Sequence, residues 1–205
     1  MEVDWSAIKR GRSSLHGAFP RVLKVPMIED AEKALYDMIP DGGSVLDIGA
    51  YDRNIERYLK NKPKKVYYKS FDVDKSLPHD YYSFDEIDER FDVAVSFEVI
   101  EHLGVKDAVG LVSNMYSVLK DGGKAVISTP NIFHPTVFWR DCTHRTGFRY
   151  QELAGIMAAS GFRNIKIYRV MKLSLKNRIT IFFYKPVLKL LDMDYAGRIL
   201  AIGER

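Results

Sequence analysis

Short apolar segments alternate with helix-like segments along most of the chain, and this alternation constrains the fold more than any other feature. Six segments have the length of strands, at residues 44–49, 65–74, 91–98, 124–130, 162–170 and 197–204. Helical patterns lie before and between them, at residues 28–39, 55–61, 105–120, 149–161 and 179–192. This order predicts an α/β fold, a mostly parallel sheet with helices on both faces. Such sheets bind ligands beyond the carboxyl ends of their strands, so a site is expected in the turns that follow strands.

The composition is that of one globular domain. With 205 residues, 46% apolar and 28% charged, the chain can bury a single core. We expect residues 28–205 to form this domain, with a helical insertion at about 174–193. Residues 1–27 are basic and weakly periodic and are expected to form an N-terminal arm or lid. A lone cysteine, Cys142, together with the lack of a secretory leader pattern, predicts a cytoplasmic protein.

The net charge of +4 is unevenly distributed. Residues 161–205 contain ten Lys and Arg against three Asp and Glu, a local balance of +7 that leaves −3 for the remainder. Such a basic region is commonly a solvated face, and the alternative is a surface for phosphate-bearing partners or a membrane. Within it, residues 177–192 combine apolar and basic side chains in one helical pattern. This helix is expected to be core, to form a homodimer, or to contact a membrane surface that carries a lipid-linked substrate.

The stretch VLDIGAYDRN, residues 45–54, indicates a ligand-binding turn. Gly49 directly follows an apolar strand, at a point where backbone can pass close to a ligand. Asp47 at the strand end can accept hydrogen bonds from an ammonium group. Asp72 ends the next strand, 23 residues after Gly49, where an acidic residue can hold the two hydroxyls of a ribose. Together these residues favour a nucleoside-containing cofactor.

Four stretches in order carry a resemblance to a known family. VLDIGAYDRNIERYL, SFDVD, FDVAVSFEVIEHL and LKDGGKAVISTPN resemble successive motifs of the class I S-adenosylmethionine-dependent methyltransferases. The resemblance covers roughly residues 28–167 and implies a Rossmann-like sheet of seven strands whose last strand is antiparallel. It further implies the residues around the cofactor: Asp47 and Gly49 near the methionine part, Asp72 on the ribose hydroxyls, Val73 beside the adenine and Asp80 at its amino group. Further cofactor-binding candidates are Ala50, Tyr51, Phe97 and Glu98.

The chain departs from the family where further glycines are usual, because Tyr51 and Arg53 occupy those positions. We expect both residues to have negative φ with outward side chains, and Tyr51 could cover the methionine part or the substrate. Cofactor binding is expected to survive. The alternative is a degenerate, non-catalytic fold.

A second group of polar residues begins at the end of a strand. Glu98, Glu101 and His102 fall in FEVIEHL, and HPTVFWRDCTHRTGF contributes Asp141 and His144. The pattern resembles two groups of metal-assisted O-methyltransferases, one acting on the terminal ribose 2′-hydroxyl of small RNAs and one on quinone-precursor phenols. That resemblance implies Glu98, Glu101, His102 and His144 as ligands of Mg²⁺ or another divalent ion. The competing interpretation is that the glutamate and histidine only organise the loop.

The density of histidines favours transfer to a hydroxyl, because an imidazole can remove the acceptor proton. His144 is the first candidate base, with Asp141 and His102 as the other catalytic candidates. The favoured function is O-methylation of a sugar, a glycan or another small molecule. An RNA ribose methyltransferase, and a non-catalytic cofactor-binding subunit that activates another protein, remain as alternatives.

Overall fold

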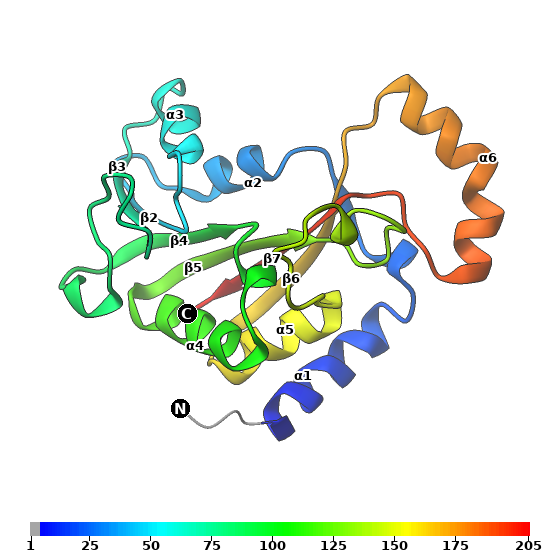
Figure 1. Ribbon diagram of the computed structural model, residues 1–205, viewed down its shortest axis with the longest axis horizontal. Helices are drawn as coiled ribbons and strands as arrows, with labels where there is room; N and C mark the ends of the chain where they lie inside the picture. The colour runs from blue at the N-terminus through cyan, green and yellow to red at the C-terminus, as the bar shows by residue number, and fades with distance from the viewer. Residues whose placement is uncertain (1–4) are drawn as a thin grey trace.

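The computed structural model describes residues 5–205, without the side chains of Ala7, Ser14, Leu15, His16 and Lys176. Its centre is a seven-stranded sheet in the order β1-β6-β7-β5-β4-β2-β3 (Figure 1). The strands are β1 (Met27–Ile28), β2 (Ser44–Ile48), β3 (Tyr67–Phe71), β4 (Phe91–Phe97), β5 (Leu119–Pro130), β6 (Arg163–Val170) and β7 (Arg198–Glu204). β7 runs antiparallel to both neighbours and the other pairs are parallel. The predicted mixed sheet with an antiparallel last strand is therefore confirmed.

Helices pack on both faces of this sheet, as predicted (Figure 1). One core joins α1, α4 and α5 to side chains such as Leu46, Ala94 and Ile127. The other joins α2 and α3 to side chains that point the opposite way from the same strands, such as Val45 and Val93. The helices are α1 (Trp5–Ala18), α2 (Ala31–Met38), α3 (Asn54–Lys60), α4 (Val105–Ser117), α5 (Tyr150–Ala159) and α6 (Leu175–Leu191), with 3₁₀ turns at Val22–Lys24, Phe84–Glu86, Ile100–His102 and Phe138–Arg140.

The N-terminal region is more regular than its sequence predicts. Residues 1–4 of the expected arm lie outside the described residues, and α1 packs along α5. The two helices approach closely because glycines meet, and a Cβ added to Gly11 would lie 2.9 Å from the Cα of Gly155. The end of the same region supplies β1, which pairs with β6 and is too short to produce a strand pattern in the sequence.

Strand register places the predicted site at one edge of the sheet. Asp47 on β2 is paired with Ser70 on β3 and with Val95 on β4. The parallel strands β2, β3 and β4 therefore end at the same level, and the turns that follow them converge.

The expected helical insertion at about 174–193 corresponds to α6. This helix lies at the periphery of the molecule, beyond the sheet and away from the two cores (Figure 1). Among the residues that the structure describes, we find no helix with the length and hydrophobicity required to cross a bilayer.

Candidate active site

Two cavities meet at Gly49 on the carboxyl edge of the sheet. The first has a volume of about 520 Å³ and the second about 840 Å³. The first is lined by Ile48, Gly49, Phe71, Asp72, Val73, Tyr82, Ser83, Phe84, Val99, Leu103, Lys106, Asp107, Gly110, Leu111 and Asn114. The second is lined by Glu32, Asp47, Gly49, Ala50, Tyr51, Asp52, Asn54, Ile55, Phe97, Glu98, His102, Asp141, Thr143 and Arg198.

The first cavity has the chemistry of a nucleoside site. Phe71, Phe84 and Leu103 give it apolar walls suited to a flat ring, and Asp72 provides a carboxylate at the end of β3. The two oxygens of Asp72 accept hydrogen bonds from the backbone N–H groups of Tyr51 and Asp74, each at 3.0 Å. These bonds orient the carboxylate and leave lone pairs for ribose hydroxyls. The residues present therefore fit the adenosine part of S-adenosylmethionine.

The loop after β2 keeps the backbone of a glycine-rich turn without its glycines. Tyr51 has φ +38° and Arg53 has φ +58°, both in the left-handed region. Our expectation of negative φ at these positions is therefore wrong, because the turn requires the conformation whatever residue occupies it. The cost is on the order of 1–2 kcal/mol for each residue. The side chain of Tyr51 is 66% exposed, so it does not fill the cavity that it borders.

Glycine is required at position 49 because a side chain there would collide with the protein itself, independently of any ligand. Its φ is +76°, and a Cβ at this position would lie 2.3 Å from Cγ2 of Val99. Val99 belongs to the turn after β4, so the absent side chain allows the ends of β2 and β4 to approach each other. The N–H groups of Gly49 and Ala50 both donate to the carbonyl oxygen of Phe71, which secures this turn against β3.

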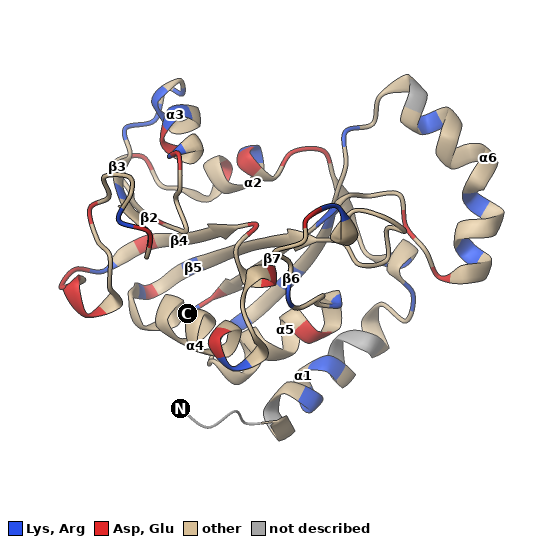
Figure 2. Ribbon diagram, viewed as in Figure 1, with Lys and Arg blue, Asp and Glu red and all other residues tan. Residues whose placement is uncertain are grey.

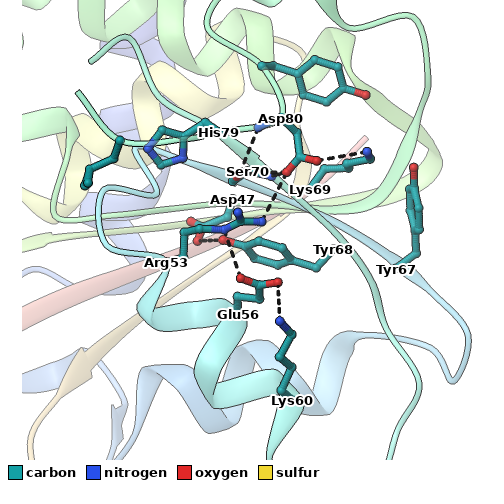
Figure 3. A network of polar contacts seen from close by, with 12 residues as sticks. Asp47, Arg53, Glu56, Lys60, Tyr67, Tyr68, Lys69, Ser70, His79 and Asp80 are labelled. Carbon is teal, nitrogen blue, oxygen red and sulfur yellow. Dashed lines mark hydrogen bonds and ion pairs between the residues drawn. The ribbon is translucent and has the colours of Figure 1, made fainter. Parts of the chain in front are cut away.

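A polar network fixes the ends of β2, β3 and α3 together (Figure 3). Asp47 is almost fully buried, and its Oδ2 accepts a hydrogen bond of 2.6 Å from the hydroxyl of Tyr68. Burial raises the pKa of Asp47 to about 7, while the Tyr68 hydroxyl acts in the opposite direction. Arg53 lies over the ring of Tyr68 and forms an ion pair of 3.0 Å with Glu56. The arginine at the glycine position is thus held by α3 and directed away from the cavities.

Asp80 belongs to this network and, within the described structure, to neither cavity lining. Its Oδ2 accepts hydrogen bonds from the backbone N–H of Ser70 at 2.9 Å and from the hydroxyl of Ser70 at 2.8 Å. Lys69 and Arg53 add ion pairs to the same carboxylate. The predicted contact of Asp80 with the adenine amino group is therefore not supported. Its carboxylate braces the edge strand β3 instead.

The second cavity is rich in carboxylates. Five acidic side chains line it, and Arg198 is the only Lys or Arg among the lining residues that the structure describes. Arg198 forms an ion pair of 3.3 Å with Glu32, and its charge also opposes the rise in the pKa of Glu98. Asp52 is paired with Arg57 at 3.0 Å. The acidic residues are Glu32, Asp47, Asp52, Glu98 and Asp141.

Glu98 reaches this cavity through a strained backbone. It has φ +54° at the end of β4, and Oε1 accepts a hydrogen bond of 2.6 Å from the hydroxyl of Ser128 on β5. Burial raises its pKa. Left-handed geometry at a non-glycine residue is kept only where the surroundings enforce it, and such residues cluster at functional sites. Phe97, the preceding residue, also lines the cavity.

Glu101, His102 and His144 form a cluster beside this cavity. One potential ligand atom from each lies within 4.8 Å of the others. The Glu101 side chain is fully buried, and Thr129 donates to its Oε2 at 3.1 Å. Its Oε1 has no hydrogen-bond partner among the described residues and lies 3.9 Å from Nε2 of His144. Burial, followed by the nearby charge of Glu98, raises the pKa of Glu101 to about 8. The structure thus brings three of the four predicted metal ligands together, with Glu98 outside this group.

The three catalytic candidates differ in position. His102 and Asp141 line the second cavity, whereas His144 does not belong to its described lining. Nδ1 of His144 lies 2.7 Å from the carbonyl oxygen of Phe138, and its ring packs against that of His102 with centroids 4.9 Å apart. His102 therefore replaces His144 as the first candidate base, because His102 lines the second cavity and His144 packs against its ring outside the described lining.

A hydrogen-bond chain sets the tautomer of His102. The hydroxyl of Thr143 donates to Oδ1 of Asp141 at 2.6 Å and lies 2.9 Å from Nδ1 of His102. Thr143 has one hydroxyl proton, and it is directed to Asp141, so the hydroxyl oxygen must accept from Nδ1–H of the imidazole. The hydrogen bonds from Thr143 lower the pKa of Asp141 and keep it ionised. His102 therefore has its basic lone pair on Nε2.

Sequence reasoning missed several lining residues. Thr143, Glu32 and Arg198 enter the second cavity from a loop, α2 and β7, and the sequence gives no indication that these segments meet. Residues in the first and second turns of α4, such as Lys106 and Gly110, line the first cavity eight and twelve residues after the predicted strand end at Glu98. The sequence signal available for them was that α4 is the first α-helix after that strand.

Comparisons with known proteins agree with this geometry. The sequence profile of a family described as "Methyltransferase domain" matches residues 25–167. No protein with a curated description matches the chain. Among solved structures, an S-adenosylmethionine-dependent methyltransferase from Archaeoglobus fulgidus superposes with a TM-score of 0.69 at 17% identity, covering 84% of this chain and 90% of that one.

Two further structures share the fold. A chain from the complex of the Haloferax volcanii Trm112 methyltransferase activator gives a TM-score of 0.62 at 15% identity, covering 98% of this chain and 95% of that one. Phosphoethanolamine N-methyltransferase 2 of Haemonchus contortus, solved with S-adenosyl-L-methionine, gives a TM-score of 0.55 at 18% identity, and the match covers 96% of this chain and 57% of that one. At these identities the structures support the fold, while the profile match over more than half of the residues defines the family. The chain belongs to the methyltransferase-domain family and is an S-adenosylmethionine-dependent enzyme of the class I type that its sequence motifs predicted.

Proposed function

We propose that this enzyme methylates a hydroxyl group of a sugar or another small polyhydroxylated acceptor. The observation that carries the proposal is the chain Asp141–Thr143–His102, which leaves the basic lone pair of the imidazole on Nε2, together with the position of His102 in the lining of a cavity rich in carboxylates. Carboxylates accept hydrogen bonds from hydroxyl groups and repel phosphates. The same cavity therefore disfavours an RNA backbone as the acceptor.

The residues divide the work between the two cavities. Asp72 would hold the ribose hydroxyls in the first cavity, and Asp47 would accept from the ammonium group of the methionine part in the second. When bound, S-adenosylmethionine supplies an electrophilic methyl group whose sulfur needs no acid to leave. The carboxylates of the second cavity would orient the acceptor hydroxyl. Nε2 of His102 would take its proton as the new carbon–oxygen bond forms and the carbon–sulfur bond breaks.

A metal-assisted version of this reaction is a second candidate, carried by one observation. Oε1 of Glu101 is buried without a hydrogen-bond partner in the described structure, and it lies close to His102 and His144. Mg²⁺ or another divalent ion held by Glu101, His102 and His144 would satisfy that oxygen and could polarise the acceptor oxygen. In this version the two imidazoles coordinate the ion, so activity would be lost in a chelator and restored by the added metal.

The test is methyl transfer from labelled S-adenosylmethionine to a panel of acceptors: free and nucleotide-linked sugars, phenols, amines and RNA. We expect label on sugar hydroxyls. Label on amines or RNA alone would contradict the proposal.

A variant with His102→Ala should lower turnover about 10²–10⁴-fold with cofactor affinity unchanged. His134→Ala is the matched control, because His134 lies outside both described cavity linings. Equal losses in the two variants would remove the role of His102 as the base. Activity that persists in a chelator would remove the metal-assisted version.

A further inference from the structure

α6 exposes an unusual amount of apolar surface. Eight of its large hydrophobic side chains are exposed, and Phe182 and Phe183 are 75% and 72% accessible to solvent. The exposed residues are Leu175, Ile179, Phe182, Phe183, Tyr184, Val187, Leu190 and Leu191. Among the α6 side chains that the structure describes, only Leu188 is buried. The helix therefore contributes little to either core and leaves most of its large hydrophobic side chains exposed to solvent.

Five of the eight exposed side chains form a stripe that faces away from the protein, and Tyr184, Val187 and Leu191 lie outside it on one side. At about 100° per residue, Leu175, Ile179, Phe182, Phe183 and Leu190 fall within roughly one-third of the helix circumference. The buried Leu188 lies on the opposite side of the helix. This arrangement is that of an amphipathic helix whose apolar face is directed outward.

Three of the four basic residues of α6 lie along one flank of this stripe, and the sequence of the helix contains no acidic residue. Arg178, Lys185 and Lys189 follow one another at intervals of seven and four residues, which places them on one line. Residues 172–191 contain no Asp or Glu. α1 likewise has Lys9, Arg10 and Arg12 without an acidic residue. In Figure 2 the described parts of both helices carry blue segments and no red ones.

We propose that α6 docks this enzyme on an anionic membrane surface, with its aromatic and aliphatic stripe among the acyl chains and its basic flank at the headgroups. Charge complementarity selects this occupant over a second copy of the chain. In two α6 helices packed through the same face, each basic flank would lie against a helix that has no acidic side chain to balance it. An anionic bilayer provides both the apolar layer and the negative charge that the stripe and its flank require.

The helix is tied to the loop that precedes β1 and to the loop that follows β5. A guanidinium N–H of Arg21 donates to the carbonyl oxygen of Lys189, and the N–H of Val22 donates to Asp192 directly after α6. The segment that follows is bonded to the loop after β5, because the side chain of Asn131 donates to Asp194 at 2.9 Å. α6 therefore lies beyond the carboxyl ends of the parallel strands, the edge that carries the two cavities (Figure 1). Docking through α6 would keep this edge close to acceptors on the membrane.

Flotation with lipid vesicles tests the proposal without reference to catalysis. We expect the purified protein to bind vesicles of phosphatidylcholine with 30–40% phosphatidylglycerol, to bind pure phosphatidylcholine much more weakly, and to be released by salt. Lys185→Glu with Lys189→Glu should weaken binding about 25-fold or more, from roughly fivefold for each basic residue. Phe182→Ser with Phe183→Ser should weaken it about tenfold or more, because the stripe loses its two rings.

Matched controls keep the test specific. Lys60→Glu with Lys65→Glu makes the same change in net charge on the far side of the sheet, and Tyr67→Ser removes an exposed ring from the edge strand β3. These controls should bind vesicles like the wild type, and circular dichroism should show every variant folded. Equal binding by wild type and α6 variants would overturn the proposal. So would a wild-type dimer that dissociates in the α6 variants while vesicles are not bound.

Discussion

Replacing Glu101 by glutamine should remove a large part of the pH dependence of folding stability. The Glu101 carboxyl is fully buried, and its pKa rises from the ordinary value of 4.5 to about 8. The folded protein then keeps this proton up to about pH 8, whereas the unfolded chain releases it near pH 4.5. Stability is therefore lost as the pH rises through this interval and levels off above it. The loss is at most about 5 kcal/mol, from about 1.4 kcal/mol for each pH unit.

Glutamine retains the shape and the acceptor oxygen of glutamate but never ionises. The variant therefore lacks the loss of folding stability that the ionisation of Glu101 causes as the pH rises. The assay is urea unfolding of wild type and Glu101→Gln from pH 5 to pH 9, in a chelator and without cofactor. We expect the variant to gain several kcal/mol relative to wild type across the interval, with the exposed Glu29→Gln as the control. A difference independent of pH would refute the reasoning, because it would mean that Glu101 ionises as readily in the folded state as in the unfolded one.

Three further predictions concern the cofactor side of the site. Asp72→Ala should weaken binding of S-adenosylmethionine by about 1.5–3 kcal/mol, and unchanged affinity in calorimetry would defeat the assignment. Gly49→Ala should destabilise the fold even without cofactor, because its Cβ meets Val99; normal urea unfolding of this variant would exclude that contact. Tyr51→Gly should be neutral or stabilising by up to about 1 kcal/mol, since it relieves a left-handed φ at an exposed residue. A loss above about 2 kcal/mol would show that the tyrosine side chain packs.

The sequence by itself determined the order of strands and helices and the carboxyl edge as the place of the site. Strands and helices were predictable because their periodicity is local, and the apolar run at β2 ends in Asp47 and Gly49 whatever surrounds it. The family resemblance added the antiparallel last strand and the seven-stranded sheet. It also identified the acidic residue at the end of β3, since position along the chain was sufficient to find Asp72.

Tertiary structure decided how the individual side chains are used. Asp80 and Asp72 both follow β3, and only packing shows that one braces Ser70 while the other faces a cavity. His102 and His144 have equivalent chemistry. Which of the two imidazoles lines the cavity depends on their partners, the hydroxyl of Thr143 for His102 and the carbonyl oxygen of Phe138 for His144. α1 was missed because its stability comes from close contact with α5 more than from its own periodicity. Local pattern specifies backbone elements, whereas the direction of a side chain depends on neighbours that are distant in the chain.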